Sequence, residues 1–221
     1  MNDLLIIDTT TSPAFIILGS KDGIKSYQTN EQFNTHASFI HQAISEILNP
    51  TDFEKIAAIA VVAGPGSYTG IKIGVAAAQG LTMAWQKPLI YLNSLDLMRV
   101  RFQKFNPEVM DNIIMMQLAR TAEFYWSTFK VKNQNDIQLQ LITASELFAQ
   151  KNKFTSDTKW LIDNETTKQE LAKIIGEQFS LSQIQYNQHD LLFLSFEYFE
   201  NRNFTNPNLA EPFYIKEVFI R

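Results

Sequence analysis

The chain carries, between residues 59 and 81, the sequence Ile59-Ala-Val-Val-Ala-Gly64-Pro-Gly66-Ser67-Tyr-Thr69-Gly70-Ile-Lys-Ile-Gly74-Val-Ala-Ala77-Ala78-Gln-Gly-Leu81. Its first part ends an almost uninterrupted apolar run from Ile56 to Ala63, which is typical of a strand buried on both faces. The glycines that follow allow a tight turn. A helix from about Ile71 to Trp85 is predicted next, and Ser67 or Thr69 can cap its beginning.

The segments around this stretch predict a mixed sheet covered by helices. Three short strands come first, at Leu4 to Ile7, Ala14 to Leu18 and Ile24 to Thr29. A helix from about His36 to Leu48 precedes the buried strand, and a strand from Leu89 to Leu92 follows the second helix. A three-strand meander followed by crossover helices is the element order of one half of an actin-like fold.

The second half of the chain partly repeats this order with more polar strands. A helix from about Ser94 to Phe105 ends before Asn106-Pro107, where we expect the boundary between two subdomains. Strands are predicted at residues 112 to 117, 122 to 130, 137 to 141 and 160 to 162. We therefore expect an α/β protein of the actin-like (ASKHA, ribonuclease H-like) class, whose two subdomains each hold a mixed sheet flanked by helices, at residues 1 to 105 and 106 to 221.

The composition excludes several classes of function. The 221 residues are 45% apolar, enough for a sizeable core, and the formal charge is −4. Because no Lys/Arg-rich run could neutralise a row of phosphates, we do not expect the chain to bind nucleic acid by itself. The absence of cysteine excludes disulfides, thiolate metal sites and cysteine nucleophiles. With no signal-peptide pattern and no apolar run near the roughly 18 residues that span a bilayer, we expect a soluble, cytoplasmic protein that binds no membrane.

The glycine loop admits two interpretations. A tight turn through Gly64, Gly66 and Gly70 exposes backbone N–H groups beside a helix N-terminus, and such a position can bind an anion. The loop is not a Walker loop, because no Gly-Lys-Ser/Thr follows it. It is not a dinucleotide fingerprint either, because the Gly-x-Gly-x-x-Gly spacing is missing. The alternative is a turn that only connects a strand to a helix.

A second segment fits the idea of a phosphate site. Asp8, Thr9 and Thr10 end the first strand and resemble the first phosphate loop of actin-like nucleotide-binding proteins, where an acidic residue and hydroxyls organise a metal-nucleotide. The alternative, a hairpin turn capped by Asp8, is favoured because no second acidic residue follows in a matching context. A phosphate or nucleotide site would consist of Asp8, Thr9, Thr10, Gly64, Gly66, Ser67, Thr69 and Gly70.

The two helices beside the glycine loop have unusual surfaces. Gly74, Ala77 and Ala78 form a stripe of small residues along which another helix or a sheet can approach closely. In the first helix, apolar residues cover an arc of roughly 180°, wider than the stripe of about 100° that faces a core: Phe39, Ile40, Ala43, Ile44, Ile47 and Leu48. Part of this surface can meet a partner, and the alternative is deep packing within a monomer.

Few residues are arranged for chemistry. His36 and His41 point about 140° away from each other on a helix, whereas metal-binding pairs normally sit at i and i+4. Glu123 and Asp163 are isolated carboxylates that form no acid and base pair. We therefore predict no catalytic residue, no metal site and no cofactor.

The stretch from Ile59 to Leu95 resembles the signature of the TsaB family. Three other pieces fit the same family: Leu5-Ile-Ile-Asp-Thr-Thr10, His36-Ala-Ser38 and Pro212-Phe-Tyr-Ile-Lys216. The resemblance implies a non-catalytic scaffold subunit in the biosynthesis of N6-threonylcarbamoyladenosine, at the adenosine 3′ of the anticodon in ANN-decoding tRNAs. It implies the catalytic paralogue TsaD as partner, TsaE in the larger complex, a homodimer when the chain is alone, and tRNA only through the complex.

The resemblance also implies where the partner binds. In the family, the first two helices form a bundle with TsaD or with a second copy. Carried over to this chain, the interface would consist of His36, Phe39, Ile40, Ala43, Ile47, Gly74, Ala77, Ala78 and Leu81. TsaD-like proteins carry a His-x-x-x-His metal pair on the first helix, and here Ile40 stands at its second position. This difference supports a scaffold over an enzyme.

The second half departs from the family pattern. Leu118 stands where the family has Asp, and the glycines usual near Ile162 and Asn164 are missing. The roles that these positions have in relatives therefore do not carry over to this chain. Two other functions stay open: an ATP-binding phosphotransferase or ATPase of the actin-like fold, and a glycoprotease-like metallopeptidase, which the histidine spacing argues against.

Overall fold

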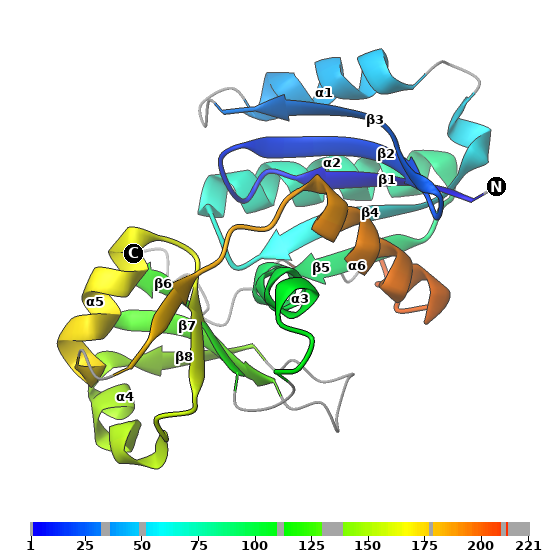
Figure 1. Ribbon diagram of the computed structural model, residues 1–221. Helices are drawn as coiled ribbons and strands as arrows, with labels where there is room; N and C mark the ends of the chain where they lie inside the picture. The colour runs from blue at the N-terminus through cyan, green and yellow to red at the C-terminus, as the bar shows by residue number, and fades with distance from the viewer. Residues whose placement is uncertain are drawn as a thin grey trace, which may run out of the picture. The chain divides into compact units, whose positions relative to one another are not determined.

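The computed structural model describes residues 2–31, 36–48, 52–109, 113–129, 139–176, 179–208 and 211. The chain divides into two units (Figure 1). Among the described residues, those within 2–94 and 187–211 belong to the first unit, and those within 95–186 belong to the second. Each unit is built on one five-stranded sheet.

The first sheet is mixed and has the order β3-β2-β1-β4-β5. β1 (Asp3–Asp8), β2 (Ala14–Ser20) and β3 (Gly23–Asn30) form the antiparallel meander. β4 (Ile56–Gly64) runs parallel to β1 and to the edge strand β5 (Leu89–Asn93). The C-terminal ends of β1 and β4 therefore lie at the same edge of the sheet, which places the turn after β1 beside the glycine loop after β4.

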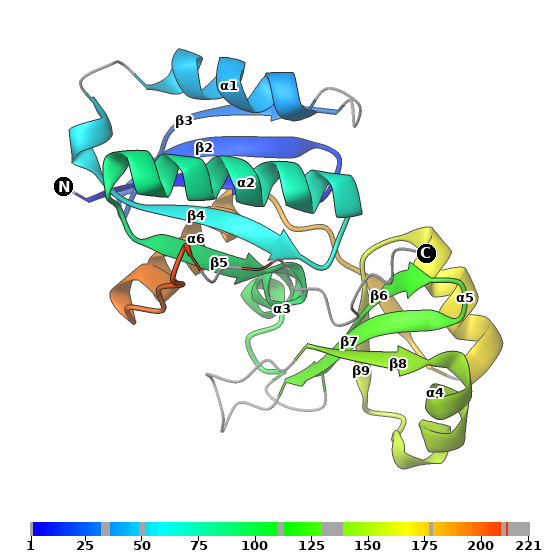
Figure 2. The same cartoon turned by 180° about the vertical axis from the view of Figure 1, so that it is seen from behind.

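Helices cover both faces of this sheet (Figures 1 and 2). α1 (His36–Ile47) and α2 (Tyr68–Trp85) contribute to one core on the first face. α6 (Gln188–Glu200) covers the other face so closely that a Cβ atom on Gly19 of β2 would lie 2.5 Å from Leu192. Because both faces are covered, every residue of β1 is buried, as an apolar central strand requires.

The second sheet is also mixed and has the order β10-β9-β6-β7-β8. β6 (Ile113–Arg120) pairs antiparallel with β7 (Glu123–Phe129) and parallel with β9 (Lys159–Ile162). β8 (Gln140–Thr143) and β10 (Leu181–Gln183) form the edges.

Helices flank the second sheet as well. α3 (Ser94–Phe105) packs on the face that holds Ile113, Met115 and Leu161. α4 (Ala144–Gln150) and α5 (Glu165–Ile175) contribute to the core on the opposite face, with Ile114, Met116 and Trp160. Neighbouring residues of β6 enter these two cores in turn, because successive side chains of a strand point to opposite faces of the sheet. Short 3-10 helices occupy Asp52–Lys55 and Lys151–Lys153.

The expected architecture of two mixed sheets flanked by helices is confirmed. The division between the units differs from the expected boundary at residues 105 and 106 in two respects. From Leu95 onward α3 belongs to the second unit, and α6 returns to the first. This return follows from the apolar side of α6, because Leu191, Leu192 and Leu194 are buried in a helix that packs on the first sheet.

Parts of the predicted strands lie outside the described residues. They are Asn112, Lys130 and residues 137 and 138, and the same holds for the expected tail from Pro212 to Lys216. The strand β10 is not predicted by the sequence pattern, since three residues are too few to show an alternation.

Candidate functional site

The glycine loop is a tight connection between β4 and α2. Gly64 has a φ of +115°, a backbone conformation that residues with a Cβ atom rarely adopt. Ser67 is the N-cap of α2, and its hydroxyl accepts a hydrogen bond of 3.3 Å from the Gly70 N–H. Of the two expected caps, Ser67 is therefore confirmed, whereas Thr69 lies inside the helix and is exposed.

The turn after β1 is held by a buried carboxylate. Asp8 is fully buried, and its Oδ1 accepts hydrogen bonds from the N–H and the hydroxyl of Thr10, at 2.8 and 2.7 Å. Thr9 and Thr10 are also buried. The geometry is that of a carboxylate-capped turn, which is the arrangement expected of the hairpin interpretation.

The glycine loop and this turn are packed against each other. The hydroxyl of Thr9 donates a hydrogen bond of 2.6 Å to the carbonyl oxygen of Gly70, and the Ser67 N–H donates one of 2.9 Å to the carbonyl oxygen of Thr10. A Cβ atom on Gly70 would lie 1.8 Å from the Thr9 carbonyl oxygen, and one on Gly66 would lie 2.7 Å from Thr10 Cβ. These two glycines are therefore required by the close approach of two backbone segments.

A further hydrogen bond holds the loop from its other side. The hydroxyl of Ser94, which directly follows β5 as the first residue of α3, donates to the carbonyl oxygen of Pro65 at 2.5 Å, and Ser94 is buried. The loop is thus anchored to both neighbours of β4 in the sheet. The residues expected at a phosphate site are brought together in space, and the polar groups just described bond to other groups of the chain.

The helix α2 buries two of its four residues that were expected at a partner interface. Gly74 and Ala78 belong to its buried residues: a Cβ atom on Gly74 would lie 2.4 Å from Thr9 Oγ1, and Ala78 is part of the core. Both residues were expected at the partner interface; in this chain their small side chains let the helix approach its own sheet. Ala77 and Leu81 are half-buried at the border of this core.

The opposite side of α2 is open. We define the outer face of α2 by its exposed residues: Tyr68, Thr69, Lys72, Ala76, Gly80, Met83 and Ala84. Met83 has 60% of its surface exposed, and a Cβ atom on Gly80 would meet no atom within 4 Å. Ala76, Gly80 and Ala84 are spaced by four residues and form one smooth row. This row is the small-residue surface that a second helix could approach.

The helix α1 uses most of its apolar arc for its own core. Ile40, Ala43 and Ile47 are buried in the core under α1 and α2, and Phe39 is half-buried against it. Ile40, Ala43 and Ile47, which were expected at the partner interface, thus contribute to the core of the chain itself. The side chain of His36 lies outside the described part of the structure.

The second unit holds a half-buried carboxylate, Asp163, whose contacts with Thr167 and Leu118 were not expected from the sequence. Thr167 Oγ1 donates to Asp163 Oδ1 at 2.6 Å and accepts from the Leu118 N–H at 3.1 Å. Burial raises the pKa of Asp163, and the hydrogen bond from Thr167 opposes this rise. Asn164 is the N-cap of α5, and Ile162 is a buried strand residue. The diverged positions thus have structural roles here, and the Asn-x-x-Thr capping pattern was the available signal for Thr167.

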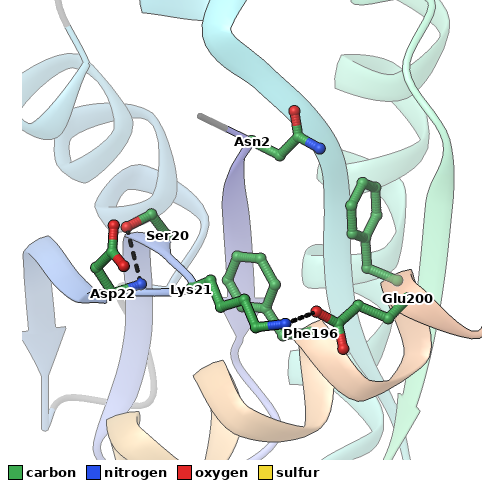
Figure 3. Close-up of a pocket in the computed structure, with 7 residues that line it drawn as sticks. Asn2, Ser20, Lys21, Asp22, Phe196 and Glu200 are labelled. Atoms are coloured by element: carbon green, nitrogen blue, oxygen red, sulfur yellow. Dashed lines mark hydrogen bonds and ion pairs between the residues drawn. The ribbon is translucent and has the colours of Figure 1, made fainter.

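A shallow pocket lies at the opposite end of β1 from the Asp8 turn (Figure 3). Phe196 and Phe199 of α6 contribute apolar surface, while Lys21 forms an ion pair with Glu200. No residue of the expected sites lines it. Within the described ranges there is no cluster of three or more His, Asp or Glu residues that could hold a metal, and no helix is long and apolar enough to cross a membrane.

The chain matches a family model and several curated proteins. Residues 29–210 match the model described as TsaD, tRNA N6-adenosine threonylcarbamoyltransferase. The tRNA threonylcarbamoyladenosine biosynthesis protein TsaB of Escherichia coli K12 is 29% identical over 136 residues, which are 61% of this chain and 57% of that protein. The TsaB protein of Haemophilus influenzae is 32% identical over 127 residues, which are 56% and 52% of the two chains. The chain thus spans about half the length of the curated relatives it matches.

A solved structure shares the fold over nearly the whole chain. It is a Pseudomonas aeruginosa protein, described as uncharacterized and similar to the peptidase YEAZ. The match has a TM-score of 0.77 at 20% identity and covers 98% of this chain and 100% of the other. At this identity the likeness establishes the fold.

Proposed function

We propose that this chain, which belongs to the family described by the TsaD model, is a non-catalytic scaffold subunit in the biosynthesis of tRNA N6-threonylcarbamoyladenosine. Its curated relatives are named as TsaB proteins of that pathway. In this role the chain binds a catalytic TsaD paralogue and supports it, and it performs no chemistry of its own.

The observation that carries the proposal is the outer face of α2. The row Ala76, Gly80 and Ala84 offers no bulky side chain, so the backbone of an apposed helix can come close to it. Met83 adds an exposed apolar side chain beside the row. A surface of this kind fits an apolar helix of a protein partner and offers no carboxylates or arginines for a small polar substrate.

Two further observations support a role without catalysis. Ile40, which stands where TsaD-like proteins have a histidine of the metal pair, is buried in the core and has no atom that can ligate a metal. The Asp8 carboxylate, which a phosphate site would need for its metal, accepts two hydrogen bonds from Thr10. Its position is that of a structural residue within the turn.

The proposal extends to the assembly in which the chain works. TsaE joins the larger complex, tRNA is contacted only through that complex, and the isolated chain uses the same surface to form a homodimer. We propose that the complex works in the cytoplasm, where its tRNA substrate is processed.

The experiment is association with the cognate TsaD. We expect the purified chain and TsaD, mixed at micromolar concentration, to elute as one heterodimer in size exclusion with light scattering. Isothermal titration with magnesium and ATP on the isolated chain is the control for the alternative of a nucleotide-dependent enzyme. Failure to associate with TsaD, together with tight binding of one ATP, would replace the scaffold by that alternative.

A further inference from the structure

We infer that Thr9 is the residue that positions α2, and with it the outer face of α2 that meets the partner. The inference rests on the proposed function for the identity of the partner. The geometry that carries it is internal to the first unit. It consists of the Thr9 hydroxyl on the carbonyl oxygen of Gly70, and of two glycines that bring the helix into contact with this residue.

The contact of the hydroxyl is specific. Thr9 is fully buried, so its hydroxyl has no water to bind, and it donates to Gly70 in the first turn of α2 at 2.6 Å. One turn further along, the position of a Cβ atom on Gly74 would be 2.4 Å from the same oxygen atom. The side chain of Thr9 therefore touches two successive turns of the helix on the side that faces the sheet.

The turn that carries Thr9 is itself held by hydrogen bonds on both sides of this residue. Asp8 accepts two hydrogen bonds from Thr10, and the carbonyl oxygen of Thr10 accepts one from the Ser67 N–H just before α2. The backbone on both sides of Thr9 is thereby held relative to the sheet. The hydrogen bond from the Thr9 hydroxyl to the carbonyl oxygen of Gly70 therefore defines the distance between α2 and β1, because the backbone that carries the donor is held in place.

Small changes at this contact act on the outer face through the length of the helix. α2 has 18 residues. Gly80 lies about 15 Å beyond Gly70 along the helix axis, at about 1.5 Å per residue. A tilt of about 5° would therefore move Gly80 by about 1.3 Å. An interface of small residues depends on close backbone approach, so a displacement of this size weakens it.

The test compares three variants of the full chain in their affinity for the cognate TsaD, measured by titration calorimetry. Thr9→Val keeps the shape and removes the donor, whereas Thr9→Ser keeps the hydroxyl. Ile17→Val removes one methylene group from the buried face of the same sheet that α6 covers, and serves as a control for general destabilisation. We expect Thr9→Val to weaken binding about tenfold, and Thr9→Ser and Ile17→Val to stay within about threefold of the wild type.

A second measurement keeps the inference testable if Thr9→Val folds poorly. Gly74→Ala displaces the Thr9 hydroxyl while it favours the helix, and we expect the same loss of affinity. Amide hydrogen exchange of the isolated Thr9→Val or Gly74→Ala chain should accelerate in residues 70–85 and stay unchanged in residues 188–200. Unchanged affinity of both variants, or an equal loss in Ile17→Val, would overturn the role of Thr9.

The two proposals fail in different ways. If the wild-type chain does not bind TsaD, the proposed function is wrong, and hydrogen exchange alone then decides whether Thr9 positions α2. If the wild-type chain binds TsaD and Thr9→Ser binds as weakly as Thr9→Val, the partner is correct and the hydroxyl is not the determinant.

Discussion

A Cβ atom on Gly70 would lie 1.8 Å from the carbonyl oxygen of Thr9, far below the 3.0 Å that real Cβ contacts essentially never cross. The backbone of Gly70 fixes the position of the Cβ atom, and the oxygen belongs to the backbone of Thr9; both residues are buried, so neither atom can turn away as the end of a side chain could. The contact between the turn after β1 and the beginning of α2 therefore requires glycine at this position.

The first prediction concerns this contact. We expect Gly70→Ala to lower the free energy of unfolding by about 3 kcal/mol, because overpacking against a backbone forces two buried segments apart. Urea denaturation followed by circular dichroism measures the change. The matched control is Gly80→Ala in the same helix, where the added Cβ meets no atom within 4 Å. There we expect a gain of up to about 1 kcal/mol from helix propensity. Equal stability of Gly70→Ala and the wild type would contradict the geometry.

The second prediction separates the two sides of α2. Ala76→Glu places a charge on the outer face, so we expect the variant to fold with near-wild-type stability and to lose the heterodimer with TsaD in light scattering. Ala78→Glu places the same charge in the core, so we expect it to unfold the chain. Ser45→Glu on the exposed side of α1 controls for added charge and should retain the heterodimer. A heterodimer that survives Ala76→Glu would place the interface elsewhere.

The strand, turn and helix at the glycine loop are predictable from sequence because their determinants are local. An apolar run predicts β4, and Ser67 predicts the helix start. Which side of α2 faces the sheet is not predictable in the same way. Gly74 and Ala78 on one side and Ala76 and Gly80 on the other are all small, so the pattern alone does not tell the side that packs closely from the side that is open.

Other features depend on contacts between segments distant in sequence. The role of Thr9 follows from Gly70, 61 residues away, and nothing in the local sequence of the turn indicates it. The return of α6 to the first unit has the same origin, because its apolar residues would suit either sheet. The resemblance to the TsaB family, by contrast, is carried by a continuous motif and is confirmed by the curated relatives.

The third prediction is a loss of stability at alkaline pH. Burial raises the pKa of Tyr91 from 10.0 to about 12, so the folded chain holds this proton more tightly than the unfolded chain. The contribution of the protonated Tyr91 to the free energy of unfolding is fully present below about pH 10. It is lost as the pH rises from about 10 to about 12, by roughly 1.4 kcal/mol per pH unit. Urea denaturation should show this loss for the wild type relative to Tyr91→Phe. A difference between the two proteins that does not change with pH would contradict it.

The fourth prediction concerns Asp163 at acidic pH. Burial raises its pKa above the ordinary value, so the folded state favours the protonated carboxyl. As the pH falls from 7 through the pKa of Asp163 in the folded state, the free energy of unfolding of the wild type should therefore increase relative to that of Asp163→Asn. Thr167→Val removes the hydroxyl that donates to the carboxylate at 2.6 Å, so the pKa of Asp163 should rise further. Carbon-detected NMR titration of the Asp163 carboxyl measures this shift. A pKa at or below the ordinary value in the wild type would show that burial does not dominate the pKa of Asp163.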